Sequence, residues 1–200
     1  MHHAISRSAA AHAAPRRHRF ITTFALAAAL LAGLLASGSA RPQAVDPSTR
    51  CGTTPNPDEV LRRLNLLRSR GAVCHQAGSL AVAAPVRWSD SLAAVAAAQS
   101  HDMALLRQMR HRDRLDRALG ERLAAAGYRF STAVENIAVG YDSLDQVVDA
   151  WVASEHHCDN MLNGAVLELG LACSDDATAP APGEGRYWTL VLGAPRRAAR

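Results

Sequence analysis

Residues 134–140 read Val-Glu-Asn-Ile-Ala-Val-Gly, and the fold prediction depends more on this stretch than on any other. Its apolar pattern predicts a β-strand that ends at Gly140. Ser143, with Gln146 three residues on, then gives the capping pattern of a helix that would turn Trp151 inward. The stretch therefore predicts a strand that passes directly into an amphipathic helix.

Three further helices are predicted before this strand. Each has a capping residue at its start and apolar residues at helical spacing. Their predicted caps and ends are Asn56 and Gly71, Ser89 and about Met109, and Asp113 and Gly127. Two late strands are predicted after the fourth helix, over residues 167–173 and 187–192. This order of elements indicates an α+β domain with helices packed on an antiparallel sheet.

A signal peptide is predicted at residues 1–40. Three arginines between residues 16 and 19 precede an apolar stretch over residues 20–35, and Gly38-Ser39-Ala40 supplies small residues for cleavage after Ala40. The apolar stretch is too short to span a bilayer comfortably, so no transmembrane anchor is expected after cleavage. A retained anchor is the alternative. The protein is expected to be exported, to the periplasm or out of the cell, and residues 41–57 to form a flexible leader.

The charge of the remaining chain excludes one class of partner. The first forty residues hold four of the 22 basic residues and no acidic one, which leaves 18 arginines against 18 acidic residues. A domain with a net charge near zero lacks the basic surface that nucleic acids require. We therefore expect no nucleic-acid partner.

All four cysteines follow the predicted cleavage site, as expected for an oxidising compartment. Four cysteines allow three pairings. Their order in the chain favours Cys51 with Cys74 and Cys158 with Cys173, because each pair brackets one local segment. A zinc site made of these cysteines is the rival interpretation, but no Cys-x-x-Cys pair is present.

Three separated segments carry the polar residues that could form a functional site. They contain His111, the pair Glu135-Asn136, and residues 154–160 with His157. Two imidazoles and a carboxylate could bind a metal ion or act as an acid/base pair. Spacing alone does not choose between such a site and exposed histidines near helix ends.

An ordered series of motifs resembles the bacterial branch of the CAP superfamily, which includes cysteine-rich secretory proteins, antigen 5 and plant pathogenesis-related proteins. The resemblance covers roughly residues 58–194 and leaves residues 195–200 as a tail. It also supports a bridge between Cys158 and Cys173, because some bacterial members have one at these positions. The most specific motifs are Glu135-Asn136-Ile137-Ala138, Trp151-x-x-Ser154, His157-x-x-Asn160 and Tyr187-Trp188.

The resemblance implies an α-β-α sandwich with a cleft that holds a His/Glu tetrad, which in some members binds a divalent cation such as zinc. Three tetrad positions match His111, Glu135 and His157. The fourth, a glutamate in many eukaryotic members, falls on Ser154. Ser154 and two asparagines are expected to line the cleft. These asparagines are Asn136 and Asn160.

Three functions remain open at this point. The first is a secreted binding module whose cleft holds a lipid, peptide or cell-wall fragment. The second is a metal-assisted hydrolase, with zinc between His111 and His157 and with Glu135 as the general base. The third is a structural envelope protein with a degenerate cleft. No Gly-x-Ser-x-Gly motif indicates a serine hydrolase.

Overall fold

The computed structural model describes residue 51 and residues 55–74, 82–180 and 184–196. The predicted signal peptide and most of the predicted leader lie outside these residues. In the described part, no helix is long and apolar enough to cross a membrane. The elements follow the order α1 (Pro57–Arg70), β1 (Arg87–Trp88), α2 (Asp90–Leu106), α3 (Leu119–Ala125), β2 (Phe130–Val139), α4 (Leu144–Val152), α5 (Glu155–Leu162), β3 (Glu168–Asp175) and β4 (Arg186–Pro195).

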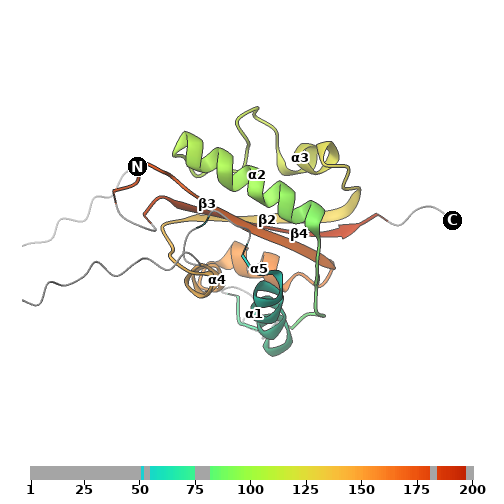
Figure 1. Cartoon of the computed structure of the whole chain (residues 1–200). Coiled ribbons are helices and arrows are strands. Elements are labelled where there is room, and N and C mark those ends of the chain that lie inside the picture. Colours follow the sequence, from blue (N-terminus) through green and yellow to red (C-terminus); the bar gives the residue numbers. More distant parts are fainter. Residues whose placement is uncertain (1–50, 52–54, 75–81, 181–183, 197–200) are drawn as a thin grey trace, which may run out of the picture. The chain divides into compact units, whose positions relative to one another are not determined.

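The strands form one sheet in the order β1-β3-β4-β2, and this sheet lies between two layers of helices (Figure 1). α2 and α3 cover one face, and α1, α4 and α5 lie on the other. β4 pairs antiparallel with both β2 and β3. The predicted α+β class and the α-β-α layers are therefore confirmed.

The sheet is mixed rather than purely antiparallel, which corrects the prediction. β1 runs parallel to the start of β3. The N–H groups of Arg87 and Ser89 donate to the carbonyl groups of Leu167 and Leu169, at 3.1 and 2.8 Å. A strand of two residues is too short to show the alternation by which strands are recognised in a sequence.

Local capping explains where α1, α2 and α4 begin. The side chains of Asn56, Ser89 and Ser143 accept backbone N–H groups two or three residues on, at 3.0, 3.4 and 3.3 Å. Gly71 ends α1 with a φ of 73°, which glycine adopts without the strain of a side chain. These starts, and the end of α1, match the predictions.

The segment between α2 and α3 differs from its prediction. α2 ends at Leu106 rather than near Met109, and α3 begins at Leu119 rather than after Asp113. The carboxylate of Asp113 accepts the N–H groups of Leu115 and Arg117, at 3.0 and 2.8 Å. These bonds close a turn, and short polar side chains compete with helix formation in this way.

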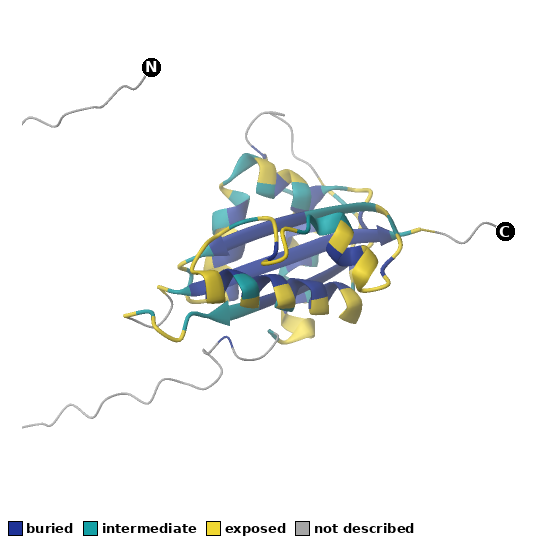
Figure 2. Ribbon diagram, turned by 90° about the horizontal axis from the view of Figure 1, so that it is seen from above, coloured by how far each residue is buried: buried dark blue, intermediate teal, exposed yellow. Residues whose placement is uncertain are grey.

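Buried residues lie along the strands and on the inner sides of the helices (Figure 2). β2 shows how the two faces divide. Ala138 belongs to the core under α1, α4 and α5, whereas its neighbour Ile137 packs with Met103 and Tyr187 on the α2 side. Neighbouring strand residues point to opposite faces, so β2 contributes to both cores.

The disulfides join Cys51 to Cys173 and Cys74 to Cys158, so the predicted pairing is wrong. The prediction assumed that cysteines close together in the sequence pair with each other. β3 extends by about 3.3 Å per residue, so Cys173 lies roughly 17 Å from Glu168 and away from α5. Cys158 on α5 instead meets Cys74, which follows α1, a helix that packs against α5. Each bridge therefore joins segments that are distant in the sequence.

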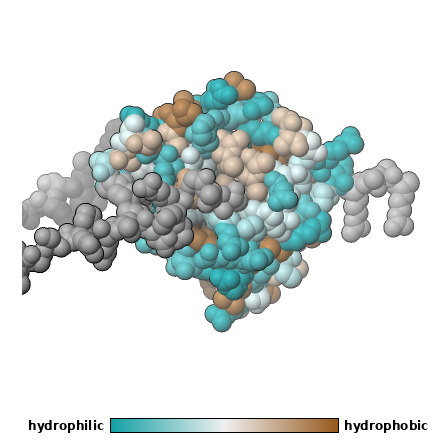
Figure 3. Space-filling view, in the orientation of Figure 1, coloured by the Kyte–Doolittle hydropathy of each residue, from teal (hydrophilic) through white to brown (hydrophobic). Residues whose placement is uncertain are grey.

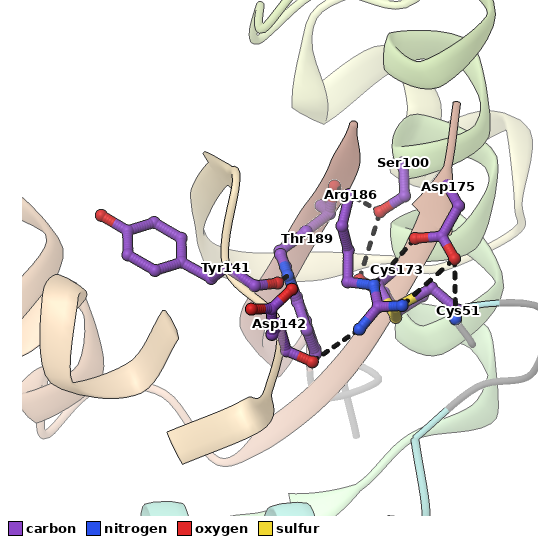
Figure 4. The surroundings of a disulfide bond; sticks show 10 residues. Cys51, Ser100, Tyr141, Asp142, Cys173, Asp175, Arg186 and Thr189 are labelled. Atoms are coloured by element: carbon purple, nitrogen blue, oxygen red, sulfur yellow. Dashed lines mark hydrogen bonds and ion pairs between the residues drawn. A yellow bond between two sulfur atoms is a disulfide. The ribbon is translucent and has the colours of Figure 1, made fainter. Parts of the chain in front are cut away.

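Arg186 and Asp175 fix the surroundings of the Cys51–Cys173 bridge (Figure 4). The guanidinium group of Arg186 donates to both oxygens of Asp175, at 2.8 and 3.2 Å, and to the carbonyl oxygen of Asp142, at 2.5 Å. The N–H of Cys51 donates to Asp175 as well, at 3.1 Å. The first described residue is thus held at the end of β3 by a covalent bond and a hydrogen bond.

Candidate functional site

His111 and Glu135 are in direct contact, although 23 residues separate them in the chain. His111 lies between α2 and α3, and Glu135 lies in the middle of β2. Nδ1 of His111 is 3.0 Å from Oε1 of Glu135, and the imidazole must carry its proton on Nδ1 to donate to a carboxylate. The Glu135 side chain is 3% exposed and that of His111 is 61% exposed. The imidazole therefore reaches a buried carboxylate from the solvent side.

Arg122 on α3 holds the same carboxylate. Its Nη2 donates to both oxygens of Glu135, at 3.0 and 2.8 Å, and to the carbonyl oxygen of His111, at 3.1 Å. The Arg122 side chain is 4% exposed. A buried carboxylate requires such compensation, because an isolated charge is costly away from water.

Sequence reasoning missed Arg122. One signal was present, since Arg122 follows Leu119 by three residues and so lies on the apolar stripe of its helix. A charged residue on a buried helix face needs a charged or polar partner. The sequence alone did not show that this partner is Glu135.

His157 lies on α5 and is partly buried. Its pKa is lowered below the ordinary value of 6.5, mainly by burial and further by the positive charges of His111 and His156. The structure therefore brings His157 close enough to His111 for their charges to interact. No hydrogen bond joins the two imidazoles in the described part of the chain.

Asn136 and Asn160 fasten α5 to β2. Nδ2 of Asn136 donates to the carbonyl oxygen of His157 at 2.9 Å, and Nδ2 of Asn160 donates to Oδ1 of Asn136 at 2.8 Å. Asn136 is fully buried. These amides thus set the position of the His157 backbone, and neither lines the cleft described next.

A cleft of about 230 Å³ lies beside His157. Its walls come from β2, from Tyr141 two residues beyond this strand, from α4 and α5, and from Ser154 between these two helices, with one further residue from the loop after α2. Most of the lining is apolar, and Ser154 and His157 supply its polar side chains. The lining residues are Met109, Ile137, Ala138, Val139, Tyr141, Ala150, Trp151, Ser154 and His157.

These residues do not fit a catalytic zinc site. Such a site has three protein ligands and an open position. Among the residues that the structure describes, no three His, Cys, Asp or Glu side chains are placed to share one ion. Glu135 is already paired with Arg122, and all four cysteines are in disulfides.

Comparison with known proteins shows the same combination of elements elsewhere. Residues 61–192 match the model of the cysteine-rich secretory protein family, CAP. The uncharacterized protein YkwD of Bacillus subtilis is 31% identical over 87 residues, which are 44% of this chain and 34% of that protein. The chain thus matches about a third of the length of this curated relative.

Two solved structures share the fold. An extracellular protein from Bacillus anthracis that contains an SCP domain superposes with a TM-score of 0.55 at 25% identity, over 68% of this chain and 39% of that one. An outer surface protein of Borrelia burgdorferi superposes with a TM-score of 0.54 at 16% identity, over 72% of this chain and 99% of that one. Because the family model spans more than half of the sequence, the chain belongs to the cysteine-rich secretory protein (CAP) family.

Proposed function

We propose that this protein is an exported binding module whose cleft beside His157 holds an apolar group of a small ligand. Export is supported by the basic and apolar character of residues 1–40 and by two long-range disulfides. Two structural relatives, an extracellular protein and an outer surface protein, agree with it.

The apolar lining of the cleft carries this proposal. Met109, Tyr141 and Ala150 line the cleft and are not buried, so a hydrocarbon group that packs on them would lose contact with water. Ligand pockets have volumes of about 300–1,000 Å³, and this cleft lies just below that range. It therefore suits one short alkyl or aromatic group, such as part of a lipid or of an apolar peptide.

The polar side of the cleft suits an uncharged hydrogen-bonding group. Because the pKa of His157 is lowered by burial and by its two histidine neighbours, the imidazole is neutral near pH 7. A neutral imidazole both donates and accepts. Together with the hydroxyl group of Ser154, it would orient a ligand hydroxyl or amide.

The metal-assisted hydrolase is the less favoured alternative, because Glu135 is already neutralised. A general base or metal ligand must be free to take a proton or an ion, and this carboxylate accepts from Arg122 through both of its oxygens. Zinc titration by calorimetry beside His111→Ala and His157→Ala tests this alternative. Stoichiometric binding that is lost in both variants would reinstate it.

The binding proposal is tested by titrating the oxidised protein with 1-octanol and with benzyl alcohol, while tryptophan fluorescence is recorded. Trp151 is a wall of the cleft, so a bound probe changes its surroundings. Ala150→Leu places a larger side chain in the cleft, and Ala153→Leu makes the same change on the same side of the molecule, outside the lining.

We expect at least one probe to bind saturably, with affinity reduced about tenfold or more by Ala150→Leu and unchanged by Ala153→Leu. Binding that both variants leave intact would place the probe elsewhere. If neither probe binds the folded protein, the proposal fails.

A further inference from the structure

The end of α2 and the loop that follows it carry apolar side chains that are exposed to solvent. In the part of the chain that the structure describes, eight large apolar side chains are exposed, and four of them lie between residues 105 and 115. Leu105 and Leu115 are 63% and 61% exposed, and Leu106 and Met109 are about half exposed. Single exposed apolar residues are common, but such a concentration indicates an interaction surface.

These side chains lie close together because the loop folds back along α2. Oδ2 of Asp102 accepts the N–H of Arg114 at 3.2 Å, which brings Leu115 beside the last turns of the helix. Leu105 and Leu106 follow Asp102 by three and four residues, so they lie on the same side of α2 as this contact. Figure 1 shows that the loop projects beyond α2 and α3, and Figure 3 shows strongly apolar atoms next to hydrophilic ones in this region.

The same segment concentrates positive charge. Five of the 22 basic residues lie between residues 107 and 117, whereas residues 130–185 contain none. A chain whose net charge is near zero after residue 40 thus gathers its arginines in one place. These are Arg107, Arg110, Arg112, Arg114 and Arg117.

The ion pairs of this segment leave its arginines on the outside. The side chains of Arg107 and Arg114 are 62% and 63% exposed, whereas their partners, Asp176 and Asp102, are each 13% exposed. Asp116 is the one exposed carboxylate among residues 105–117. The surface that faces solvent is therefore positively charged.

Buried groups hold the segment in one conformation. Asp113 is 2% exposed and accepts the N–H groups of Leu115 and Arg117. Nε2 of Gln99, which is fully buried, donates to the carbonyl oxygen of Arg110 at 2.6 Å. The surface is thus formed before anything binds to it, so binding does not have to pay the entropy of ordering a loop.

The mixture of leucines and arginines suits a lipid surface better than a protein partner. The centre of a protein interface is depleted of charge, whereas each of the four apolar side chains here has an arginine within two residues. At a bilayer, apolar side chains enter the boundary between head groups and acyl chains, and basic residues are attracted to anionic head groups. The guanidinium group also matches the geometry of a phosphate group.

We propose that residues 105–117 dock the protein on the surface of a bilayer that contains anionic phospholipids. Leu105 and Leu115 would enter the head-group region, and the exposed arginines would bind phosphate groups. Met109 also lines the cleft beside His157, so the docking surface adjoins that cleft. Docking does not require the cleft to be occupied.

The test is sedimentation of the oxidised protein with vesicles. One set contains phosphatidylcholine alone, and the other contains phosphatidylcholine and phosphatidylglycerol in equal parts. The protein used lacks residues 1–40, because their apolar stretch would itself enter a bilayer. Every described helix and strand lies after residue 50, and circular dichroism checks that each variant is folded.

One pair of double variants tests the apolar contacts. Leu105→Ser with Leu115→Ser removes the two most exposed leucines of the docking surface. Leu66→Ser with Leu167→Ser is the matched control, because these are the exposed leucines outside residues 105–117 in the described part of the chain.

A second pair tests the charges. Arg107→Gln with Arg112→Gln removes two exposed arginines of the docking surface. Arg62→Gln with Arg70→Gln removes two exposed arginines of α1, which lies on the other face of the sheet. Both double variants change the net charge equally, so a difference between them reports where the charge lies.

We expect the protein to bind the anionic vesicles about tenfold or more tightly than the neutral ones. Each double variant of the docking surface should weaken this binding by about tenfold or more, and each control should change it by less than about twofold. The proposal is overturned if the protein does not sediment with the anionic vesicles, or if the controls weaken binding as much as the docking-surface variants do.

Ala150→Leu separates this surface from the cleft. It fills the cleft and should leave sedimentation unchanged, whatever the outcome of the alcohol titrations. If Ala150→Leu weakens vesicle binding and the docking-surface variants do not, the vesicles contact the cleft instead, which also overturns the proposal.

Discussion

Arg122 and Glu135 form the buried ion pair on which the structure of the site depends. Both side chains are at most 4% exposed, and Nη2 of Arg122 lies 2.8 Å from one carboxylate oxygen. The desolvation of two charges is offset only while both are present. Replacing one partner alone is therefore expected to lower the free energy of unfolding by far more than the intact pair raises it.

Arg122→Met is expected to lower the free energy of unfolding by about 3–5 kcal/mol, because Glu135 is left buried without its cation. Urea unfolding at pH 7 measures this. Arg112→Met is the control, since Arg112 is 54% exposed in its pair with Asp116 and such pairs contribute about 1 kcal/mol or less. Equal losses in the two variants would show that burial of the Arg122–Glu135 pair does not matter for stability.

A double variant separates charge burial from packing. Adding Glu135→Leu to Arg122→Met removes the unpaired charge, so most of the stability should return. If the double variant is as unstable as Arg122→Met, the loss comes from packing around Arg122 rather than from an uncompensated carboxylate.

The lowered pKa of His157 predicts how the free energy of unfolding depends on pH. Its folded-state pKa lies below the ordinary 6.5, so the folded protein binds this proton less readily than the unfolded chain does. The contribution of neutral His157 to the free energy of unfolding is therefore complete above about pH 6.5. It is lost as the pH falls from 6.5 through the lowered pKa. His157→Gln should flatten the dependence of unfolding free energy on pH between 5 and 7. An unchanged dependence would show that His157 titrates alike in both states.

At the scale of elements, the parts read correctly from the sequence are those fixed by near neighbours. The caps at Asn56, Ser89 and Ser143 each need only a side chain and an N–H two or three residues away. The parts that failed need distant partners. β1 exists only because β3 lies beside it, and Arg122 gains its role only when α3 packs on β2.

The close packing of α2 on β3 depends on Gly170. A Cβ atom at this position would lie 2.0 Å from the backbone nitrogen of Ala93 and 2.3 Å from the carbonyl carbon of Leu92. Both neighbours are backbone atoms, so they yield only if the whole helix moves. Gly170 thus allows α2 to approach the sheet.

Gly170→Ala is expected to destabilise the protein by at least about 1–3 kcal/mol, the usual cost of overpacking. Thermal unfolding of the oxidised protein measures it. Gly164→Ala is the matched control, because nothing lies within 4 Å of a Cβ atom at that position. A Gly170→Ala protein as stable as this control would mean that α2 does not pack as described.

At the scale of the whole molecule, the two disulfides hold together segments that are distant in the sequence. They span 122 and 84 residues. On the loop-entropy model, closures of about 100 residues stabilise a fold by about 4.7 kcal/mol. Sequence order could not reveal this pairing, since cysteines pair according to the path of the folded chain.

Disulfide mapping without reduction is expected to find Cys51 joined to Cys173 and Cys74 joined to Cys158. Trypsin alone cannot settle the pairing, because residues 130–185 contain no lysine or arginine and Cys158 and Cys173 stay on one peptide. A glutamate-specific protease that cuts after Glu168 separates them. A peptide pair that joins Cys158 to Cys173 would contradict the fold.

The fold thus places a buried ion pair behind His111 and an apolar cleft beside His157, and we propose that this cleft binds a ligand. Met109 reports on it directly, because it lines the cleft with a half-exposed side chain, and Met109→Leu identifies its methyl signal. The measurement is the NMR signal of its ε methyl group during titration of the oxidised protein with 1-octanol or benzyl alcohol. We expect a saturable shift with at least one probe, with affinity reduced about tenfold or more by Ala150→Leu and unchanged by Ala153→Leu. A methyl signal that neither probe moves, or one that shifts equally in both variants, would contradict the proposal.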